Sequence, residues 1–467
     1  MKLLYTNFPY PTEIHDVVKL FFNDVQLVDQ HTQDVDIVVT ESMQNIAIYF
    51  YVATAMGKSV TQCVDVDGLD ELQVVRLRKR YAKLAIYNLL VEICGKTMPW
   101  GSLTGIRPTK LADQLTLEGL DWRKTFTNLL GVSESKTQLV ADILRTQGDL
   151  HLHKVGCADL YVGVPFCVTR CSYCSFTSGE IHRLKKYVDP YVVALREDLI
   201  KTLDFAKRKG IQINNVYFGG GTPTSLSAKQ LDEIMSCIDV KPTEFTVEAG
   251  RPDTIDREKL DVLLKHGVHR VSINPQTFNQ SVLDVIGRKH TVQDIYDKYK
   301  VAKEYGFVVN MDLIAGLPTE TYEMFCNSID KAIALGPDNI TVHTLALKHG
   351  SALKEQNYDG SNDVGKMVDY SREQLYKAGY LPYYMYRQKY MAENLENVGY
   401  CKHNTPCLYN IGIMEEISDI LACGTNAISK RIVSPQNRIE RSANAKDVIT
   451  YIERNEDYLN RKFQLFS

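Results

Sequence analysis

The stretch from Tyr161 to Phe176 reads Y-V-G-V-P-F-C-V-T-R-C-S-Y-C-S-F. It places Cys167, Cys171 and Cys174 in a C-x3-C-x2-C run directly after residues 158–164, an apolar segment typical of a buried strand. Three thiolates on one loop can hold an iron–sulfur cluster, and on a four-iron cluster they leave one iron open to a ligand that is not protein. A structural zinc ion takes four protein ligands. The zinc alternative therefore needs a fourth ligand from among Cys157, His151, His153 and His182.

Length and composition limit the classes of protein to which the chain can belong. Its 467 residues are too many for one compact core and indicate two or three domains. The net charge of −3 gives no general attraction to nucleic acid. The start of the chain lacks the long apolar segment of a secretory signal, and no apolar run is long enough for an integral membrane segment. Scattered cysteines without an export signal predict a reducing, cytoplasmic location.

Between residues 157 and 347, strand-like segments alternate with helix-like segments. The strand-like segments are residues 160–164, 215–218, 244–249, 269–274, 308–314 and 339–347. One intervening helix is expected to begin after Asp256, a good N-cap, and to stop at Gly267. Repeated units of this kind predict an α/β fold with a parallel sheet and right-handed crossovers. The pattern alone fits both an open partial barrel and a doubly wound sheet.

Polar residues gather where the predicted strands end. The cysteines follow the first strand, and the turn Gly219–Pro223, which reads G-G-G-T-P, follows the second. Glu248 lies on the third strand, Gln276 follows the fourth and Asp312 lies on the fifth. In both parallel architectures, ligands bind at the carboxyl ends of the strands. The sequence therefore predicts one site at that edge of the sheet.

The region before about residue 150 carries weaker signals. Residues 36–40 and 45–53 have strand character, and residues 74–93, 121–130 and 134–146 have helical character. A loop at 100–111 leads into a further helix. Arg107 and Lys110 in this loop could meet a carboxylate or phosphate group, although solvated loop charges are the simpler interpretation. No motif here indicates chemistry.

The region after residue 348 combines a helical pattern at 364–377 with a tyrosine-dense segment at 380–390, which includes Arg387 and Lys389. An aromatic, basic surface suits a flat tetrapyrrole with carboxylate edges, and packing on a sheet face explains the tyrosines equally well. Farther on, three residues invite a haem or metal site, although ordinary loop residues are the simpler interpretation. They are Cys401, His403 and Cys407.

The cysteine run, with Tyr161 six residues ahead and Tyr173 just before the third cysteine, resembles the cluster loop of the radical S-adenosylmethionine (SAM) enzymes. It is most similar to the oxygen-independent coproporphyrinogen III oxidase and haem-chaperone group. The resemblance implies a partial (β/α)6 barrel over residues 151–347. It also implies a C-terminal α+β substrate-covering domain over residues 348–467. The resemblance covers roughly residues 158–430, so the N-terminal α/β region of unknown role over residues 1–150 is predicted from the residue pattern alone. The implied cofactors are a 4Fe–4S cluster on the three cysteines and one or two SAM molecules.

The resemblance also implies SAM contacts at positions that match the family's motifs. They are Tyr161, Tyr173, Gly220, Gly221, Thr222, Glu248, Gln276, Arg288, Asp312 and Ala346. In this family the glycine turn grips the amino group of SAM, and here it lacks the lysine of a phosphate-binding P-loop and the spacing of a dinucleotide site. Simpler alternatives are structural pairing for Glu248, an exposed turn charge for Arg288 and plain packing for Ala346.

The implied reaction is radical chemistry on a propionate group of coproporphyrinogen III. A reduced cluster passes one electron to SAM, the resulting radical removes hydrogen from the substrate, and loss of carbon dioxide leaves a vinyl group. The implied partners are a tetrapyrrole substrate or haem, and a one-electron donor such as flavodoxin or ferredoxin.

The chain departs from the oxidase at Phe176, where the oxidase has a fourth cysteine. An aromatic residue there is similar to the haem chaperones and to a divergent oxidase-like branch with an extra N-terminal region. The long first region favours that branch. A haem-binding chaperone without dehydrogenase activity and a radical SAM methyltransferase remain as alternatives.

Overall fold

The computed structural model of the chain describes residues 1–105, 107–152, 155–348, 350–355, 358, 363–389, 391–434 and 438–467. His153, a candidate zinc ligand, and Tyr390, the end of the tyrosine-dense segment, lie outside the described residues. The described residues form two compact units. One is Met1–Ala141 with Arg387–Leu395, and the other is Asp142–Tyr386 with Glu396–Ser467. The division of the chain near residues 150 and 347 stays a prediction.

A five-stranded sheet with the order β2-β1-β3-β4-β5 forms the centre of the first unit. Its strands are β1 (Lys2–Thr6), β2 (Val25–Val28), β3 (Ile37–Gln44), β4 (Ile48–Ala55) and β5 (Lys58–Asp65). The predicted strand at 45–53 begins too early, because Asn45 and Ile46 have φ values of 50° and 66° and form the hairpin turn between β3 and β4. Helices α1 (Pro11–Val18) and α2 (Glu71–Cys94) share an apolar core with this sheet.

Helices α3 (Pro108–Leu117), α4 (Trp122–Lys124) and α5 (Glu134–Gln147) follow along the chain. The predicted helix at 121–130 is divided, because α4 continues as the π-helix η1 (Thr125–Leu129). Arg107 and Lys110 are partly buried, so they are not the fully solvated charges of the simpler interpretation.

The two basic residues of the tyrosine-dense segment are engaged within the first unit. The Arg387 guanidinium lies 4.9 Å from the centre of the Trp100 ring and donates to the Leu103 carbonyl at 3.1 Å. Lys389 forms an ion pair with Asp16 at 2.6 Å. These contacts are structural, so the two cations serve packing in this unit.

An eleven-stranded sheet runs through the second unit, in the order β14-β15-β13-β12-β11-β10-β9-β6-β16-β17-β18. Its central strands pair in parallel and each lies beside the next in sequence, which excludes the reversed strand order of a doubly wound sheet. The predicted partial barrel is therefore confirmed. The central strands are β6 (Cys157–Val164), β9 (Gln212–Gly220), β10 (Glu244–Val247), β11 (Arg270–Ser272), β12 (Val308–Ala315) and β13 (Asn339–Thr344).

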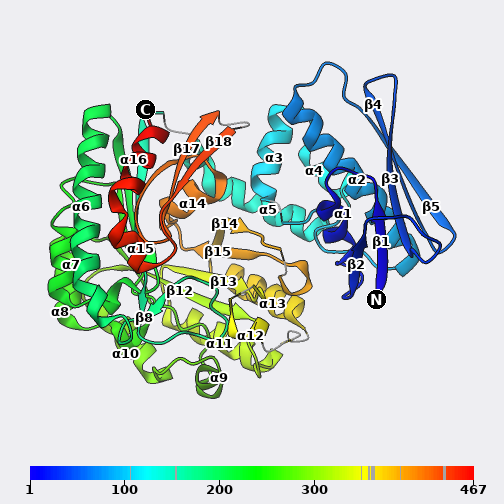
Figure 1. Cartoon of the computed structure of the whole chain (residues 1–467). Helices are drawn as coiled ribbons and strands as arrows, with labels where there is room; N and C mark the ends of the chain where they lie inside the picture. Colours follow the sequence, from blue (N-terminus) through cyan, green and yellow to red (C-terminus); the bar gives the residue numbers. More distant parts are fainter. Residues whose placement is uncertain are drawn as a thin grey trace. The chain divides into compact units, whose positions relative to one another are not determined.

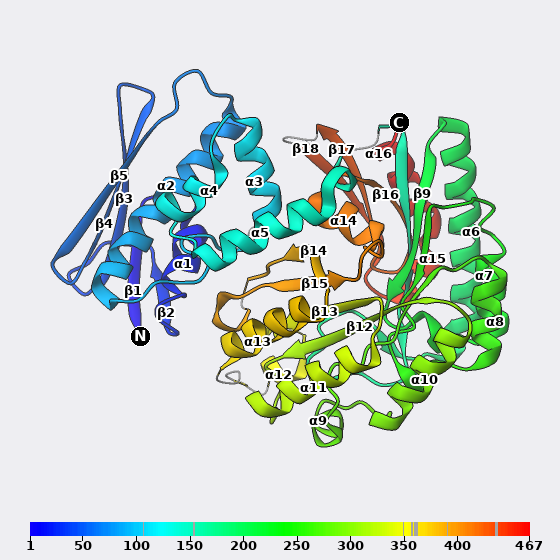
Figure 2. The same ribbon diagram turned by 180° about the vertical axis from the view of Figure 1, so that it is seen from behind.

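Helices connect these strands and cover the outer side of the sheet, as Figures 1 and 2 show for α6, α7, α8 and α10. The predicted limits of α8 are confirmed, since Asp256 caps its first turn through the Lys259 N–H and Gly267 has a φ of 73°. The connecting helices are α6 (Lys185–Lys209), α7 (Ala228–Met235), α8 (Arg257–Lys265), α9 (Gln280–Val285), α10 (Val292–Glu304) and α11 (Tyr322–Leu335).

The rest of the chain extends both edges of the barrel sheet. On one edge, β15 (Asn397–Cys401) pairs antiparallel with β13, and β14 (Leu381–Tyr386) pairs with β15. On the other edge, β16 (Asp419–Gly424) pairs in parallel with β6, followed by β17 (Ile428–Ser434) and β18 (Arg438–Ala443). The remaining helices are α12 (Ala352–Glu355), α13 (Val364–Lys377), α14 (Leu408–Glu415), α15 (Val448–Glu453) and α16 (Asn455–Leu465).

Candidate active site at the carboxyl ends of the barrel strands

The cysteine loop follows β6 at the carboxyl end of the barrel strands. Cys167 lies on β7 (Phe166–Cys167), which pairs with β8 (Gly179–Glu180), and the Cys174 N–H donates to the Cys171 carbonyl at 3.1 Å. Burial and the neighbouring charges of Cys171 and Cys167 raise the pKa of the Cys174 thiol to about 11. A nearby cation, such as a bound metal centre supplies, would favour the charged form of the Cys174 thiol.

Arg251 holds the cysteine loop in place, although no sequence pattern singled it out. Its guanidinium is 3% exposed and donates to the Thr169 carbonyl at 3.1 Å and to the Thr169 hydroxyl at 2.7 Å. It also forms a bidentate pair with Asp253, at 3.0 Å and 2.8 Å. The signal that could have found Arg251 is its place three residues after Glu248, at the end of a predicted strand.

The glycine turn after β9 lies against the cysteine loop. The Gly221 N–H donates to the Val164 carbonyl, and the Thr222 N–H donates to the Phe166 carbonyl, each at 2.7 Å. Gly220 has a φ of 109°, and a Cβ on Gly221 would lie 2.6 Å from the Phe166 carbonyl oxygen, so neither position accepts a side chain. The Thr222 hydroxyl lies 3.5 Å from the sulfur of Cys167. The glycines thus let the turn pack directly against the backbone at Val164 and Phe166, next to the cysteine loop.

Glu248 lies one residue beyond the end of β10 and not on the strand as predicted. Its Oε1 accepts from the Tyr217 hydroxyl at 2.5 Å. Burial and the charge of Asp312 raise the pKa of Glu248 to about 7, although Tyr217 and His343 act to lower it. No lysine or arginine is among the largest influences on this pKa, which fits a carboxylate that is not held by a structural cation.

Asp312, on β12, belongs to a polar group that spans β12 and β13. Asn310 donates to Asp312 Oδ1 at 2.8 Å, and His343 Nε2 lies 3.6 Å from Asp312 Oδ2. Burial alone would raise the pKa of Asp312, but the contacts with His343 and Asn310 hold it below its usual value. His343 Nδ1 lies 3.2 Å from the Tyr386 hydroxyl. His343 was not predicted, although it alternates with Thr341 along β13 as Asp312 alternates with Asn310 along β12.

Gln276 and Arg288 are the buried polar members of the predicted set. Gln276 has a φ of 68°, and its N–H donates to the Asp312 carbonyl at 2.9 Å. Arg288 is 6% exposed and donates to the Asn274 carbonyl and to the Tyr173 hydroxyl, the latter at 3.3 Å. The interpretation of Arg288 as an exposed turn charge is therefore wrong. Ala346 lies beyond the end of β13 and contributes a methyl group, so plain packing stays open for it.

Three tyrosine rings stack beside Glu248. The ring centres of Tyr217 and Tyr409 lie 4.3 Å apart, and that of Tyr161 lies 6.3 Å from each. Burial and the charge of Glu248 raise the pKa of all three hydroxyls, so they keep their protons. Of this stack the sequence analysis named only Tyr161.

Several buried polar atoms at this site have no hydrogen-bond partner. They are Gln276 Oε1, Arg288 Nε, Asn274 Oδ1 and Ser172 Oγ. A buried polar atom without a partner costs about 1–3 kcal/mol, and a bound ligand can complete it. The thiols, the glycine turn, the two carboxylates and these unpaired atoms therefore fit an iron–sulfur cluster together with a cofactor that carries an amino-acid group and a positive charge.

The zinc alternative finds no fourth ligand in the described part of the chain. Cys157 begins β6, at the far end of that strand from the cysteine loop, and the exposed His182 lies 3.6 Å from Glu180. The side chains of His151 and His153 are outside the described residues. Among the residues that are described, no three His, Cys, Asp or Glu side chains converge to hold one ion. A four-iron cluster does not require such convergence, because each thiolate binds a different iron atom.

Comparison with known proteins agrees with this geometry. The model of the Radical SAM superfamily matches residues 161–332. The oxygen-independent coproporphyrinogen-III oxidase-like protein HemZ of Bacillus subtilis (strain 168) is 34% identical over 97% of this chain and 94% of its own length. The chain belongs to this radical SAM family. Membership implies a 4Fe–4S cluster and SAM as cofactors.

Other radical SAM relatives match a smaller share of the chain. The haem chaperone HemW of Bacillus subtilis is 37% identical over 40% of this chain and 50% of its own length. The solved structure of HemN, the coproporphyrinogen III oxidase of Escherichia coli, has a TM-score of 0.51 and 22% identity, and the match covers 67% of this chain and 72% of that one. This likeness shows a common fold. Within the described residues, no helix combines the length and the apolar character needed to cross a membrane.

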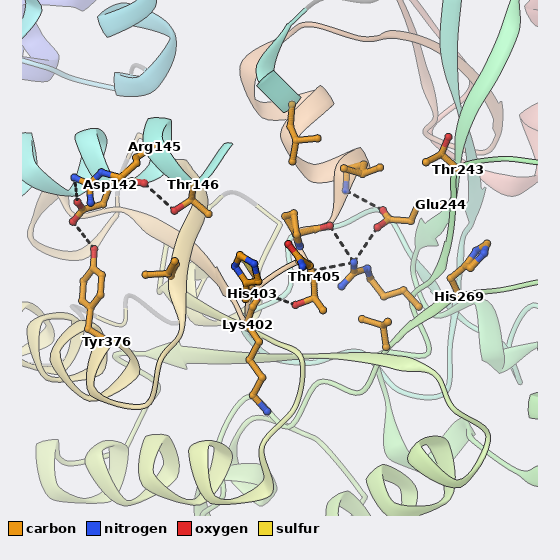
Figure 3. A pocket seen from close by; sticks show the side chains of 18 residues that line it. Asp142, Arg145, Thr146, Thr243, Glu244, His269, Tyr376, Lys402, His403 and Thr405 are labelled. Atoms are coloured by element: carbon orange, nitrogen blue, oxygen red, sulfur yellow. Dashed lines mark hydrogen bonds and ion pairs between the residues drawn. The ribbon is translucent and has the colours of Figure 1, made fainter. Parts of the chain in front are cut away.

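A pocket of about 620 Å3 lies at the opposite, amino ends of the same strands. It is lined by the first residues of β10, β11 and β12, by Cys401 at the end of β15 and by the following loop with His403. Cys407 is buried nearby, and its thiol donates to Glu244 at 3.1 Å. Figure 3 shows Thr243, Glu244 and His269 on one side of the pocket, with Asp142, Arg145 and Tyr376 on the other.

Proposed function

We propose that the protein is an oxygen-independent coproporphyrinogen III dehydrogenase, which converts propionate groups of that tetrapyrrole to vinyl groups in porphyrin and haem biosynthesis. The observation that carries the proposal is the relation to the oxidase-like protein HemZ, which extends over 97% of this chain. That relation takes in the N-terminal region as well as the barrel, whereas the relation to the Bacillus subtilis haem chaperone covers 40% of the chain.

The carboxyl ends of the barrel strands would hold both cofactors. Cys167, Cys171 and Cys174 would bind the cluster, and Gly220–Thr222 with Glu248 would hold the amino-acid end of SAM. When bound, these cofactors supply the radical that removes hydrogen from the substrate. The task of the chain itself is to fix the reacting groups and to exclude water.

Two features near Glu248 suit a tetrapyrrole with carboxylate edges. The aromatic cluster of Tyr161, Tyr217 and Tyr409 would pack against the apolar part of the macrocycle. Arg288 keeps its charge because Tyr173 and Cys171 raise its pKa despite burial, and its unpaired Nε can donate to a carboxylate of SAM or substrate. A second SAM molecule would use the neighbourhood of Gln276 and Asp312.

An anaerobic assay tests the proposal directly. The reconstituted full chain is incubated with SAM, a reductant and coproporphyrinogen III, and mass spectrometry follows loss of carbon dioxide and formation of vinyl groups. The expected products are protoporphyrinogen, methionine and deoxyadenosine. Deoxyadenosine without carbon dioxide loss would overturn this substrate, and S-adenosylhomocysteine would assign a methyltransferase instead. Equilibrium dialysis with SAM counts one or two molecules per chain.

A haem-binding chaperone is the second candidate, and the amino-end pocket favours it. The pocket is lined by two imidazoles, His269 and His403, and its volume of about 620 Å3 is that of a small-molecule site. His269 Nδ1 accepts from the Phe245 N–H at 3.2 Å, which leaves Nε2 to face other groups. Haem titration followed by absorbance tests this candidate. His403→Ala should abolish stoichiometric binding and Asn404→Ala should not, while equal binding by both variants would remove the candidate.

A further inference from the structure

Phe176 is an aromatic side chain exposed to solvent beside the cysteine loop. It is 63% exposed and lies two residues after Cys174. Among the phenylalanine and tryptophan residues that the structure describes, no other is exposed. Phe166, in the same loop, is fully buried. Packing of the fold therefore does not explain Phe176, and an exposed aromatic side chain is typical of an interface.

Exposed basic side chains lie within ten residues of Phe176 along the chain. After Phe176 the chain turns back as β8, which pairs with β7 at Cys167, and then carries Arg183, Lys185 and Lys186, all exposed. Arg170 is also exposed, and its charge acts on the Cys174 thiol. Between Pro165 and Lys186 the one acidic residue is Glu180, in a chain whose overall charge is −3. The surface beside the cysteines is thus locally basic.

Two lysines, Lys185 and Lys186, lie at the end of α6 that favours negative charge. Lys185 and Lys186 begin α6, where the first turn contains no acidic residue and Leu184 makes no side-chain cap. The amino end of a helix favours anions, so lysines there are unfavourable for the helix itself. A residue placed against the local preference commonly serves function. Here the lysines and the helix dipole add to the same positive potential.

We infer that Phe176 with Arg170, Arg183, Lys185 and Lys186 forms the docking surface for a small acidic one-electron carrier protein of the flavodoxin or ferredoxin class. This donor face rests on the proposed radical SAM function, which consumes an electron from outside the chain. One electron leaves the reduced carrier and enters the oxidised cluster on the cysteines. No bond is formed or broken and no proton moves in this step.

Charge and position favour this occupant. An apolar centre with a charged rim is the usual anatomy of a protein interface, and complementary charge raises the rate of encounter. The partner must be acidic, because the rim is basic. It would dock two residues from Cys174, so the electron path to the cluster is short.

The experiment measures the dissociation constant of oxidised, FMN-loaded flavodoxin for the reconstituted full chain, by calorimetry at low and high salt. Phe176→Ser should weaken binding about tenfold, as loss of an interface anchor does. Its control is Val193→Ser on α6, because Val193 is equally exposed at 63%. Lys185→Glu with Lys186→Glu should weaken binding about tenfold or more at low salt and less at high salt. Its control is Lys207→Glu with Arg208→Glu, which lie about 30 Å away along the same helix.

The outcomes separate this inference from the proposed function. Unchanged affinity in both donor-face variants, or equal losses in their controls, would overturn the docking surface even if vinyl product forms. Selective losses without vinyl product would support the surface and leave the substrate wrong. Reduction of the cluster by dithionite should be equal in all variants. A dimer that Phe176→Ser abolishes, with carrier affinity unchanged, would assign the surface to a second copy of the chain and overturn the inference.

Discussion

Glu244 and Glu248 stand at the two ends of β10 in opposite surroundings. Glu244 accepts from Arg270 at 2.9 Å and from the Cys407 thiol and the Leu408 N–H, each at 3.1 Å. Glu248 accepts from the Tyr217 hydroxyl at 2.5 Å, and its pKa is raised to about 7. At the amino end, a buried charge is paired and ties strands together. At the carboxyl end, a similar charge lacks a cation, and we propose that SAM supplies it.

The largest expected effect contrasts cysteines at the two ends. Cys171→Ala should abolish the iron–sulfur absorption near roughly 400 nm after anaerobic reconstitution, because the cluster loses one of three thiolates. Cys407→Ala removes another buried thiol, at the amino end, and should leave that absorption intact. The measurements are the iron content and the absorbance of both variants. A full band in Cys171→Ala would end the radical SAM interpretation of the loop.

The glutamates themselves give the next largest effect. Glu244→Gln should lower the free energy of unfolding by about 3 kcal/mol, because Arg270 would keep a buried charge without its partner. Glu248→Gln should leave stability unchanged or raised and weaken SAM binding at least about tenfold. Urea unfolding and equilibrium dialysis with SAM measure the two quantities. If both variants lose stability equally, Glu244 and Glu248 both serve the fold, and the proposed difference between them is wrong.

The barrel could be predicted from sequence because its signals are local and repeated. Alternating strand and helix patterns between residues 157 and 347 predicted parallel units, and the clustering of polar residues at strand ends predicted the site. The strand order that excludes a doubly wound sheet depends on long-range pairing, such as β6 with β9, which no periodicity reveals. The edge strands β15 to β18 were missed for the same reason, whereas the alternating tyrosines of residues 380–390 had indicated the sheet face on which β14 lies.

Within the site, residues in recognisable motifs were predicted and residues that act through tertiary contacts were not. Cys167 and Gly220 lie in short motifs. Arg251 binds Thr169, which lies 82 residues earlier in the chain, and the Tyr409 ring stacks on Tyr217, which is even more distant in sequence. His343 becomes part of the site only when β13 aligns beside β12, which sets it near Asp312. The spacing of residues along the sequence does not reveal these tertiary contacts.

The pH dependence of Glu248 sharpens the comparison further. Because its pKa in the folded protein, about 7, exceeds the ordinary 4.5, the folded state without SAM binds the proton more tightly than the unfolded state does. The corresponding stability, up to about 3 kcal/mol, is present below pH 4.5 and is lost as pH rises through about 7. SAM affinity should rise over the same interval, because the cofactor needs the charged carboxylate. Unfolding and dialysis at about half-unit steps between about pH 5.5 and 8 should show both trends in the wild type. In Glu248→Gln the SAM affinity should lose its pH dependence and the loss of stability should become smaller, because the raised pKa values of Glu320, about 7, and Asp159, about 6, still contribute to it.

The smallest expected effect concerns Thr222, whose hydroxyl lies 3.5 Å from the sulfur of Cys167. Donation to a ligating sulfur stabilises the reduced, more negative cluster, so Thr222→Val should lower its midpoint potential by about 30–60 mV, the equivalent of about 1 kcal/mol for one electron. Thr224→Val is the matched control, because that hydroxyl contacts Thr254 at 2.6 Å and not a cysteine. Anaerobic redox titration distinguishes them. If the two variants shift the potential equally, the contact with Cys167 does not influence the midpoint potential. The Thr222 hydroxyl would then serve only the fold, as the groups around Glu244 do.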